Sequence, residues 1–376
     1  MKVTIPVAKS VQGGLVLYST SIKVKYLVEP GFYSIEKLDP DNKTETGYQR
    51  VLNTARAKKL AEYILNGQDS QDAFLPTSIL LATDKDIRLN EPENTITISK
   101  ETGPFSVVDG QHRLEGLRMA AEKNDDILDF QVPVNIAIKL DKISQMCHFL
   151  IVNTTQKSVD KGVEQRIYAR LTEVVVTEHI PSLPKWIQAI INRGEIDKAL
   201  KIVDYLNAEE NSPWKGKIQI ADHKKKGATI KQGSFVTLLK KNFLVANNPL
   251  LALGDPDAEK KIFLNYWKAI SVLLDDNSDT VLYKYNGVDL FCKFSIPFFQ
   301  KLMAADPTAF QVDRIKNELQ GCFESMDGEY AGVGHPEWWH KGGVAGGMNS
   351  GALTKVVQAM AQALNRQNMT SGEIKT

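Results

Sequence analysis

The chain is poor in cysteine, in net charge and in long apolar runs. Its 376 residues include three cysteines, Cys147, Cys292 and Cys322, and no CxxC pair. This scarcity excludes a disulfide framework and a cysteine-based zinc cluster, and it is typical of a reducing compartment. Lysine and arginine total 46 against 45 acidic residues, a net charge of +1. No global field therefore attracts nucleic acid, and any DNA binding has to use a local patch.

No run of 18 apolar residues occurs, and the opening residues MKVTIPVAKS lack the apolar core of a signal peptide. We therefore expect a cytoplasmic protein that is not inserted in a membrane. The composition, 43% hydrophobic and 24% charged, is that of a globular protein. The length suggests two domains.

The predicted secondary structure changes near residue 160. Before it, alternating β-branched segments predict strands over 14–28, 77–82, 94–99, 105–108 and 132–139, and apolar stripes predict helices over 54–65, 113–123 and 142–151. After it, helices are predicted over 163–178, 186–201, 234–246, 257–274 and 312–325. We predict an α+β fold, with a mixed domain over 1–160. A mainly α-helical domain over 161–376 follows, with a lysine-rich loop at 207–233.

The stretch SVVDGQHRLEGLRMA, residues 106–120, places four polar groups where a strand hands over to a helix. Free N–H groups and the helix dipole make such a junction a ready anion site, and Gly110 permits the tight turn. Arg113 can clamp phosphate oxygens, and His112 can donate a hydrogen bond or a proton. Asp109 can hold Mg²⁺ or orient a water, and Gln111 can position an attacking water.

The same spacing also fits a purely structural turn. In that interpretation Asp109 caps the helix, Arg113 makes a surface ion pair and His112 is an interior residue with its hydrogen bonds satisfied. No GxxxxGK[ST] and no GxGxxG after a strand occurs in the sequence, which excludes P-loop and Rossmann sites. A nucleoside triphosphate site at this turn is thus one of two interpretations.

The run Asp109-Gly110-Gln111-His112-Arg113 resembles the signature of the DGQHR-domain family. Further resemblances cover most of the chain. They are Gln49-Arg50, Asn153-x-x-Gln156-Lys157, Trp214-Lys215-Gly216-Lys217-Ile218, Gln232-x-Ser234-Phe235 and the segment from Trp339 to Gly343.

The resemblance implies a ParB/sulfiredoxin-like fold for the N-terminal domain, in which a comparable strand–turn–helix motif binds nucleotide phosphates. It also implies a bacterial DNA-modification context. One branch, the DndB type, is linked to phosphorothioate modification and control of its operon. Another, the DpdB type, is an ATPase partner of a transglycosylase that inserts a 7-deazaguanine base. The Leu-Glu-Gly-Leu continuation after the motif favours the DpdB type.

The flanking elements extend the expected site. Gln49 and Arg50 precede a helix with basic residues and can complete the phosphate site or contact a DNA backbone, although the residues taken alone favour a solvated helix entry. Lys157 can supply a second phosphate contact and Asn153 can tie its segment to the Asp109 turn. Gln156 belongs to the same resemblance. By spacing alone this segment is only a capped helix start.

The loop over 215–231 is the candidate nucleic-acid contact. It carries Lys215, Lys217, Lys224, Lys225, Lys226 and Lys231 and one acid, Asp222. Lysines on a loop can neutralise phosphates, and Trp214 can stack on an exposed base. A solvated charged face is the alternative. His335, Glu337 and His340 are a disfavoured metal site, because their spacing is not HExxH and no nearby cysteine completes a tetrahedron.

The leading hypothesis is an ATP-binding, ATP-hydrolysing component of a DNA-modification system that uses Mg²⁺, while a partner transglycosylase acts on DNA. The rival is a DNA-binding regulator of a phosphorothioate-modification operon without turnover, and a nuclease ranks below both. The residues do not choose between ATP, CTP and GTP, and they leave the oligomeric state open, a homo-oligomer included.

Overall fold

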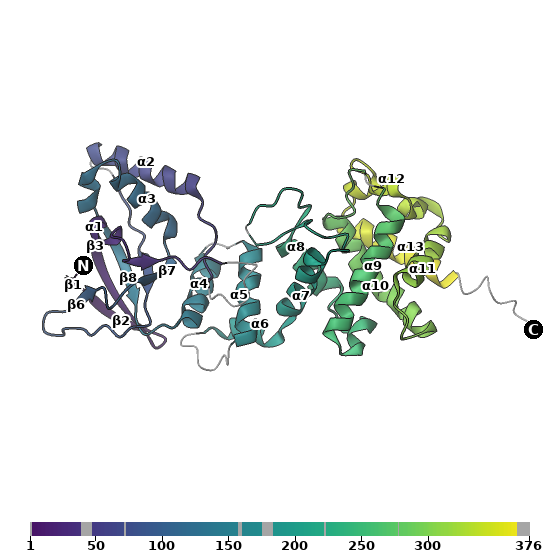
Figure 1. Cartoon of the computed structure of the whole chain (residues 1–376), viewed down its shortest axis with the longest axis horizontal. Coiled ribbons are helices and arrows are strands. Elements are labelled where there is room, and N and C mark those ends of the chain that lie inside the picture. Colours follow the sequence, from purple (N-terminus) through teal and green to yellow (C-terminus); the bar gives the residue numbers. More distant parts are fainter. Residues whose placement is uncertain are drawn as a thin grey trace, which may run out of the picture. The chain divides into compact units, whose positions relative to one another are not determined.

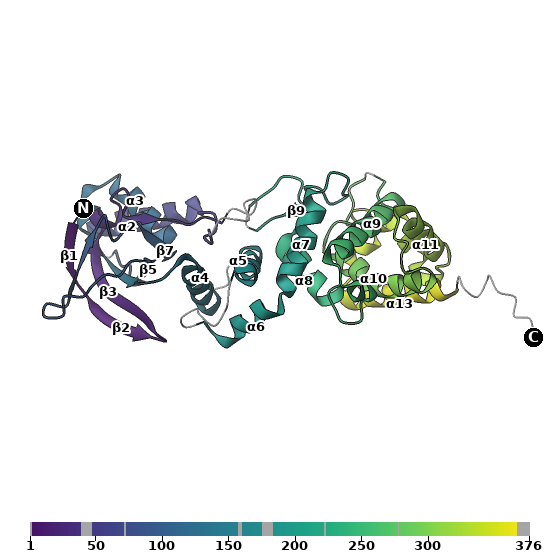
Figure 2. The same cartoon turned by 60° about the horizontal axis from the view of Figure 1, so that its bottom comes forward.

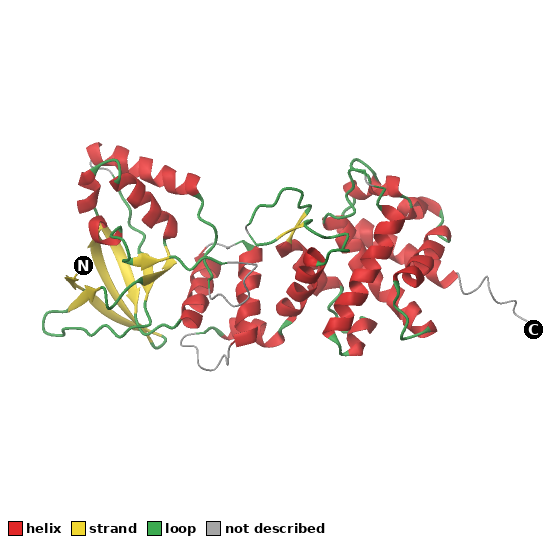
Figure 3. Ribbon diagram, in the orientation of Figure 1, coloured by secondary structure: helices red, strands yellow, loops and turns green. Residues whose placement is uncertain are grey.

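The computed structural model describes residues 2–38, 47–70, 73–156, 160–174, 183–221, 223–276 and 278–366. The chain divides into two compact units, Met1–Asn192 and Arg193–Thr376. Strands gather in the first unit and helices make up most of the second, so the predicted α+β class is confirmed (Figure 3). The predicted boundary at 160/161 lies inside the first unit. The ParB/sulfiredoxin-like assignment stays a prediction.

The first unit is built on a mixed six-stranded sheet with the strand order β2-β3-β8-β5-β7-β4. The strands of unit 1 are β1 (Lys2–Pro6), β2 (Ala8–Gln12), β3 (Leu15–Lys23), β4 (Tyr33–Ser34), β5 (Ile79–Ala82), β6 (Thr95–Ser99), β7 (Phe105–Asp109) and β8 (Gln131–Ala137). β1 and β6 form a separate antiparallel pair. In the main sheet β5 runs antiparallel to β7 and parallel to β8.

The helices of unit 1 are α1 (Val24–Leu27), α2 (Thr54–Ser70), α3 (Gln111–Ala121), α4 (Lys142–Gln156), α5 (Lys161–Val174) and α6 (Lys185–Arg193), whose last residue falls in unit 2. α2 and α3 lie side by side (Figures 1 and 2). Gly116 allows this close packing, because a Cβ there would lie 2.9 Å from a methyl carbon of Leu60. The packing of α2 on α3 fixes the start of both helices relative to the sheet.

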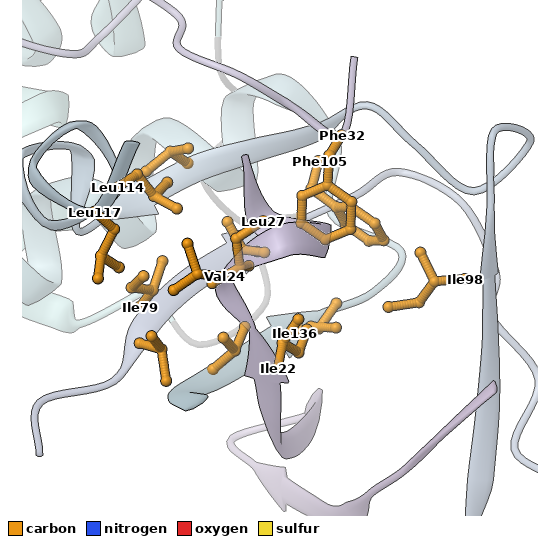
Figure 4. Close-up of a cluster of buried hydrophobic side chains, with 14 of the residues drawn as sticks. Ile22, Val24, Leu27, Phe32, Ile79, Ile98, Phe105, Leu114, Leu117 and Ile136 are labelled. Carbon is orange, nitrogen blue, oxygen red and sulfur yellow. The ribbon is translucent and has the colours of Figure 1, made fainter. Parts of the chain in front are cut away.

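The core of unit 1 lies between the sheet and α3. Leu114 and Leu117 of α3 face Ile79 of β5 together with Val24 and Leu27 of α1, and all five are buried (Figure 4). Full burial of one such side chain stabilises the fold by about 1.5–3 kcal/mol. α3 therefore begins at a fixed point directly above the end of β7.

The helical unit consists of α7 (Glu195–Ala208), α8 (Gln232–Asn242), α9 (Pro256–Leu274), α10 (Tyr285–Ala305), α11 (Val312–Glu324), α12 (Pro336–Trp339) and α13 (Ser350–Arg366), with the short pair β9 (Ile218–Gln219) and β10 (Ile230–Lys231). A cluster of buried aromatic side chains from α8, α9 and α10 forms its centre. Within the described residues, no helix is long and apolar enough to cross a membrane.

Several sequence predictions need correction. The strand predicted over 14–28 ends at Lys23, and the chain turns into α1. The helix predicted over 186–201 is broken at Gly194, which has a φ of 63° and separates α6 from α7. α10 and α13 were not predicted. α10 contains Pro297 and is apolar on most sides because it is buried, so it lacks the polar stripe that marks a surface helix.

Candidate functional site

The turn between β7 and α3 has the geometry of an anion site. β7 ends at Asp109, Gly110 occupies the N-cap position, and α3 begins at Gln111. No side chain of the described residues caps α3. The first N–H groups of an α-helix have no partner within the helix, and the helix dipole places positive charge there. The interpretation that Asp109 caps the helix is therefore wrong, because Gly110 holds the N-cap position, and residues 111–113 line a cavity.

Gly110 is required by both conformation and space. Its φ is 108°, in the left-handed region that favours glycine. A Cβ at this position would lie 3.1 Å from two side-chain carbons of Ile79. The turn can therefore lie this close to β5 only if residue 110 has no side chain.

Arg113 is held at the turn by two side chains. Its Nη2 donates to Oδ2 of Asp109 at 2.5 Å, and its Nη1 donates to Oγ1 of Thr77 at 2.8 Å. The side chains of Arg113 and Asp109 are 20% and 36% exposed, so the pair is half-buried rather than on the surface. Nε of Arg113 is buried without a hydrogen-bond partner among the described residues. The guanidinium is therefore oriented in advance and borders open space.

His112 is neutral at physiological pH. Its Nε2 accepts a hydrogen bond from the backbone N–H of Asn53 at 3.1 Å, which places the ring proton on Nδ1. Burial lowers its pKa to about 4, and the charges of Arg50 and Arg56 add to this effect. His112 can consequently donate a hydrogen bond through Nδ1–H but carries no proton to transfer near pH 7. The alternative that His112 holds an internal contact is partly right.

Gln111 presents an unpartnered acceptor. The residue is 4% exposed, and its Nε2 makes a long contact of 3.4 Å with the carbonyl of Arg50. Its Oε1 is buried with no hydrogen-bond partner among the described residues. Buried polar atoms in folded proteins are almost always satisfied, so this oxygen is suited to a water or a ligand. Gln111 lines the same cavity as Arg113.

The cavity at the turn has a volume of about 240 Å³ and is strongly basic. Arg50, Arg56 and Arg113 line it, against one acid, Asp109. Arg56 comes from the first turn of α2, whose start is capped by the Asn53 side chain on the N–H of Arg56 at 3.1 Å. The start of α3 and the Arg56 side chain from the first turn of α2 therefore line the same cavity. Sequence reasoning missed Arg56 and Thr77 as site residues, although Arg56 follows the Gln49-Arg50 element closely.

Gln49, Arg50 and Asn153, predicted to extend the site, make different contacts. Nε2 of Gln49 donates to the carbonyls of Val107 and Val108 at 2.6 and 3.0 Å, so Gln49 fixes its segment to the end of β7. Arg50 lines the cavity. Asn153 lines it too, but its Nδ2 donates to Phe149 O of its own helix at 2.8 Å. The predicted link from Asn153 to the Asp109 turn is not formed.

The predicted contacts at Gln156 and Lys157 cannot be placed. Gln156 ends α4, which continues beyond the predicted end at residue 151. The Gln156 side chain and Lys157 lie outside the described residues.

The Trp214 prediction is wrong. Trp214 is 0% exposed and packs against Phe235, Trp267 and Tyr283 with ring centroids 4.8, 4.8 and 5.0 Å away. A ring in this position is part of the core and is closed to a base. Gln232 is also buried, and its Oε1 accepts from the N–H of Ala221 at 3.2 Å. These elements of the C-terminal half therefore hold the fold together.

The lysines of the loop fall into two groups. Lys217 is half-buried, with its Nζ 3.4 Å from the ring centroid of Tyr283, and burial lowers its pKa. Lys215 pairs with Glu210. Lys224, Lys225 and Lys226 are exposed. Lys215 is exposed as well, so four of the predicted DNA contacts keep an accessible position among the described residues.

Metal chemistry has one candidate ligand at the turn. Within the described residues, no group of three or more His, Cys, Asp or Glu side chains is arranged to hold a metal ion. His340 pairs with Asp276 at 2.9 Å. Mg²⁺ is commonly bound by one or two carboxylates plus substrate phosphates and water. Asp109 fits that role as a single carboxylate, provided that the ion arrives with phosphate.

Comparison with known proteins relates the N-terminal part to DNA modification. Residues 5–175 match the family model DndB, described as DNA-sulfur modification-associated. This segment contains the turn, the 240 Å³ cavity and every described residue that lines it. No curated protein and no solved structure matches the chain. The match supports a relationship to DNA-modification proteins.

Proposed function

We propose that this chain binds the polyphosphate of a nucleoside triphosphate at the β7–α3 turn, and hydrolyses it, as a component of a DNA-modification system. The observation that carries the proposal is the 240 Å³ cavity where the start of α3 meets the side chains of three arginines among the described residues. Helix N-termini and arginine forks are the groups that bind phosphate oxygens best. ATP is the nucleotide we assign, with CTP and GTP as alternatives.

The residues at the turn supply the parts that phosphoryl transfer needs. Arg113 and the N–H groups of residues 111–113 neutralise charge on the phosphates. Oε1 of Gln111, which lacks a partner among the described residues, accepts a hydrogen bond from the attacking water and orients it. Neutral His112 donates Nδ1–H and does not serve as an acid. Asp109 would hold Mg²⁺, which supplies further charge neutralisation when it is bound.

The proposed context is DNA sulfur modification, supported by the match of residues 5–175. The chemistry on DNA belongs to a partner enzyme, and nucleotide turnover prepares DNA for that partner. A 7-deazaguanine system with a transglycosylase partner is the alternative context. Adding the purified enzymes of each system in turn separates them, because only the true partner should raise the rate of turnover.

Phosphate release with and without DNA tests the proposal. Asp109→Ala and Arg113→Ala should both lose Mg²⁺-dependent turnover. Arg118→Ala is the matched control, because Arg118 lies on the same helix but pairs with Glu115 and Glu122 away from the cavity. Equal rates in the wild type and all three variants would remove the turn from the chemistry.

A second candidate is a DNA-binding regulator without turnover. The sulfur-modification match and the exposed lysines at 224–226 favour it. A regulator should prefer its operator over random DNA by about 10³ or more and should need no nucleotide. Titration of both DNAs with and without ATP decides between the two functions.

A further inference from the structure

A second cavity, of about 690 Å³, borders the turn on the face of the sheet opposite the core that α3 covers. Its lining includes Leu17 of β3, Leu80 of β5 and Ala137 of β8, with Ile151 and Val152 of α4. The alternation of strand side chains explains this position, because successive residues point to opposite faces. The residues beside them in sequence, Tyr18, Leu81 and Ile136, belong to the buried core.

The charge of this cavity differs from that of the cavity at the turn. Among the described residues, aliphatic side chains make up about half of its lining, and the Asp109–Arg113 pair supplies its only carboxylate and guanidinium. Leu15, Leu17 and Leu80 are partly exposed although they are apolar. Volumes of about 300–1,000 Å³ with apolar walls and a few polar groups are typical of small-molecule sites.

His148 provides a polar group in this apolar lining. It lies on α4, is 8% exposed and lines the cavity. Its Nε2 is buried without a hydrogen-bond partner among the described residues. Burial lowers the pKa of His148, so the ring is neutral and Nε2 can donate or accept according to its tautomer. A buried ring nitrogen without a partner is suited to the polar edge of a ligand.

The two cavities share a boundary. Thr77, Asp109 and Arg113 line both of them. Arg113 donates to the other two, so the three side chains form one hydrogen-bonded partition. One side of the partition is basic and small, and the other is apolar and larger. A molecule with an anionic tail and a flat apolar ring matches this pair of environments.

We infer that the 690 Å³ cavity binds the base and sugar of the nucleotide whose phosphates lie at the start of α3, and that His148 hydrogen-bonds the edge of the base. This inference rests on the proposed function and adds to it the recognition of the nucleoside. In the bound state the phosphates compete with Asp109 for Arg113, so the partition opens along the Asp109–Arg113 pair. The occupant is a neutral heterocycle with apolar faces and a polar edge.

Calorimetric titration with three probes tests the inference: ATP, adenosine and inorganic tripolyphosphate. Leu17→Trp places an indole in the apolar cavity, and Val11→Trp is its control. Val11 lies on β2, is 61% exposed and is not part of the cavity lining. Leu17→Trp should weaken ATP binding at least tenfold, to the level of tripolyphosphate, and leave tripolyphosphate binding unchanged.

His148→Leu is the second variant, in case Leu17→Trp fails to fold. It keeps the cavity apolar and removes the ring nitrogen. It should weaken ATP and adenosine binding by roughly three- to tenfold, the effect of one lost neutral hydrogen bond, without changing tripolyphosphate binding. Circular dichroism of each variant verifies that it is folded.

The outcomes separate this inference from the proposed function. If tripolyphosphate and ATP bind to folded Leu17→Trp and His148→Leu as tightly as to the wild type, the base lies elsewhere and only the inference fails. If these variants retain ATP binding but lose binding of single-stranded DNA, the cavity holds an extruded base and the inference is overturned. If tripolyphosphate does not bind the wild type, the proposed function itself fails.

Discussion

In the sequence, the β7–α3 turn of unit 1 and the segment 214–231 of unit 2 both carry residue types that suit a ligand. In the structure, the side chains of these two segments lie in different surroundings. At the turn, Arg113, Gln111 and His112 line a cavity. In the loop, Trp214 is buried and Lys217 lies over the Tyr283 ring. Residue types that suit a ligand thus line a cavity in one unit and pack in the core of the other.

The difference lies in the backbone. A strand that ends in a left-handed glycine and starts a helix leaves N–H groups that the fold itself does not satisfy. The N–H groups of residues 214–218 all donate within the fold, and the Trp214 ring packs among aromatic side chains. Backbone geometry therefore discriminates between a site and a core element better than side-chain chemistry.

The largest expected effect is a loss of stability when Trp214 is replaced. Trp214→Ala removes a fully buried ring and should lower the free energy of unfolding by about 3–5 kcal/mol. Chemical denaturation measures it, with Trp186→Ala as the control because Trp186 is 45% exposed. If Trp214→Ala is as stable as the wild type but binds DNA poorly, Trp214 stacks on a base and the contrast between the two segments is wrong.

At the turn, Arg113→Ala should lower kcat/KM for ATP hydrolysis by roughly 10²-fold, the typical effect of removing one preorganised charge-stabilising group. Steady-state phosphate release gives the number. The stability of the variant should fall far less than that of Trp214→Ala, because Arg113 is half-buried and polar. A loss of stability without any change in turnover would make Arg113 a structural residue.

Gly110→Ala tests the backbone argument itself. A residue with a side chain at a φ of 108° should cost about 1–2 kcal/mol and displace the start of α3. Gly227→Ala is matched, since its φ is 88° and no atom lies within 4 Å of the added Cβ. Both should destabilise the protein, but only Gly110→Ala should weaken tripolyphosphate binding. Equal binding in the two variants would contradict the account.

The exposed lysines should have a smaller, non-specific effect. Replacing Lys224, Lys225 and Lys226 together with alanine should weaken binding to all DNA sequences alike. If each lysine contacts a phosphate, the slope of log affinity against log salt should fall by about 1 per lysine. Filter binding at several salt concentrations measures the slope. An unchanged slope would remove this loop from the DNA interface.

The smallest expected effect is on the pH dependence of the free energy of unfolding. Because the pKa of His112 is lowered to about 4 in the folded protein, the unfolded chain binds more protons between pH 4 and the ordinary value near 6.5. Stability from this group is present above pH 6.5 and is lost as the pH falls through this window. His112→Gln should flatten that part of the stability curve. A curve that keeps its slope would mean that His112 is not the titrating group.

Much of unit 1 could be predicted from sequence, because alternating strands and the amphipathic stripe of α2 are local signals. The turn was found because its polar residues are adjacent. Arg56 and His148 were not found as site residues, because tertiary packing alone brings them to the cavities. α10 was missed because burial on most sides hides its periodicity.

The most direct test of the central claim is a crystal structure with Mg²⁺ and a non-hydrolysable ATP analogue. The account predicts phosphate density within hydrogen-bonding distance of the Arg113 guanidinium and the first N–H groups of α3. A bound analogue elsewhere on the chain, with Arg113 still paired to Asp109 and the cavity at the turn filled only by solvent, would contradict it.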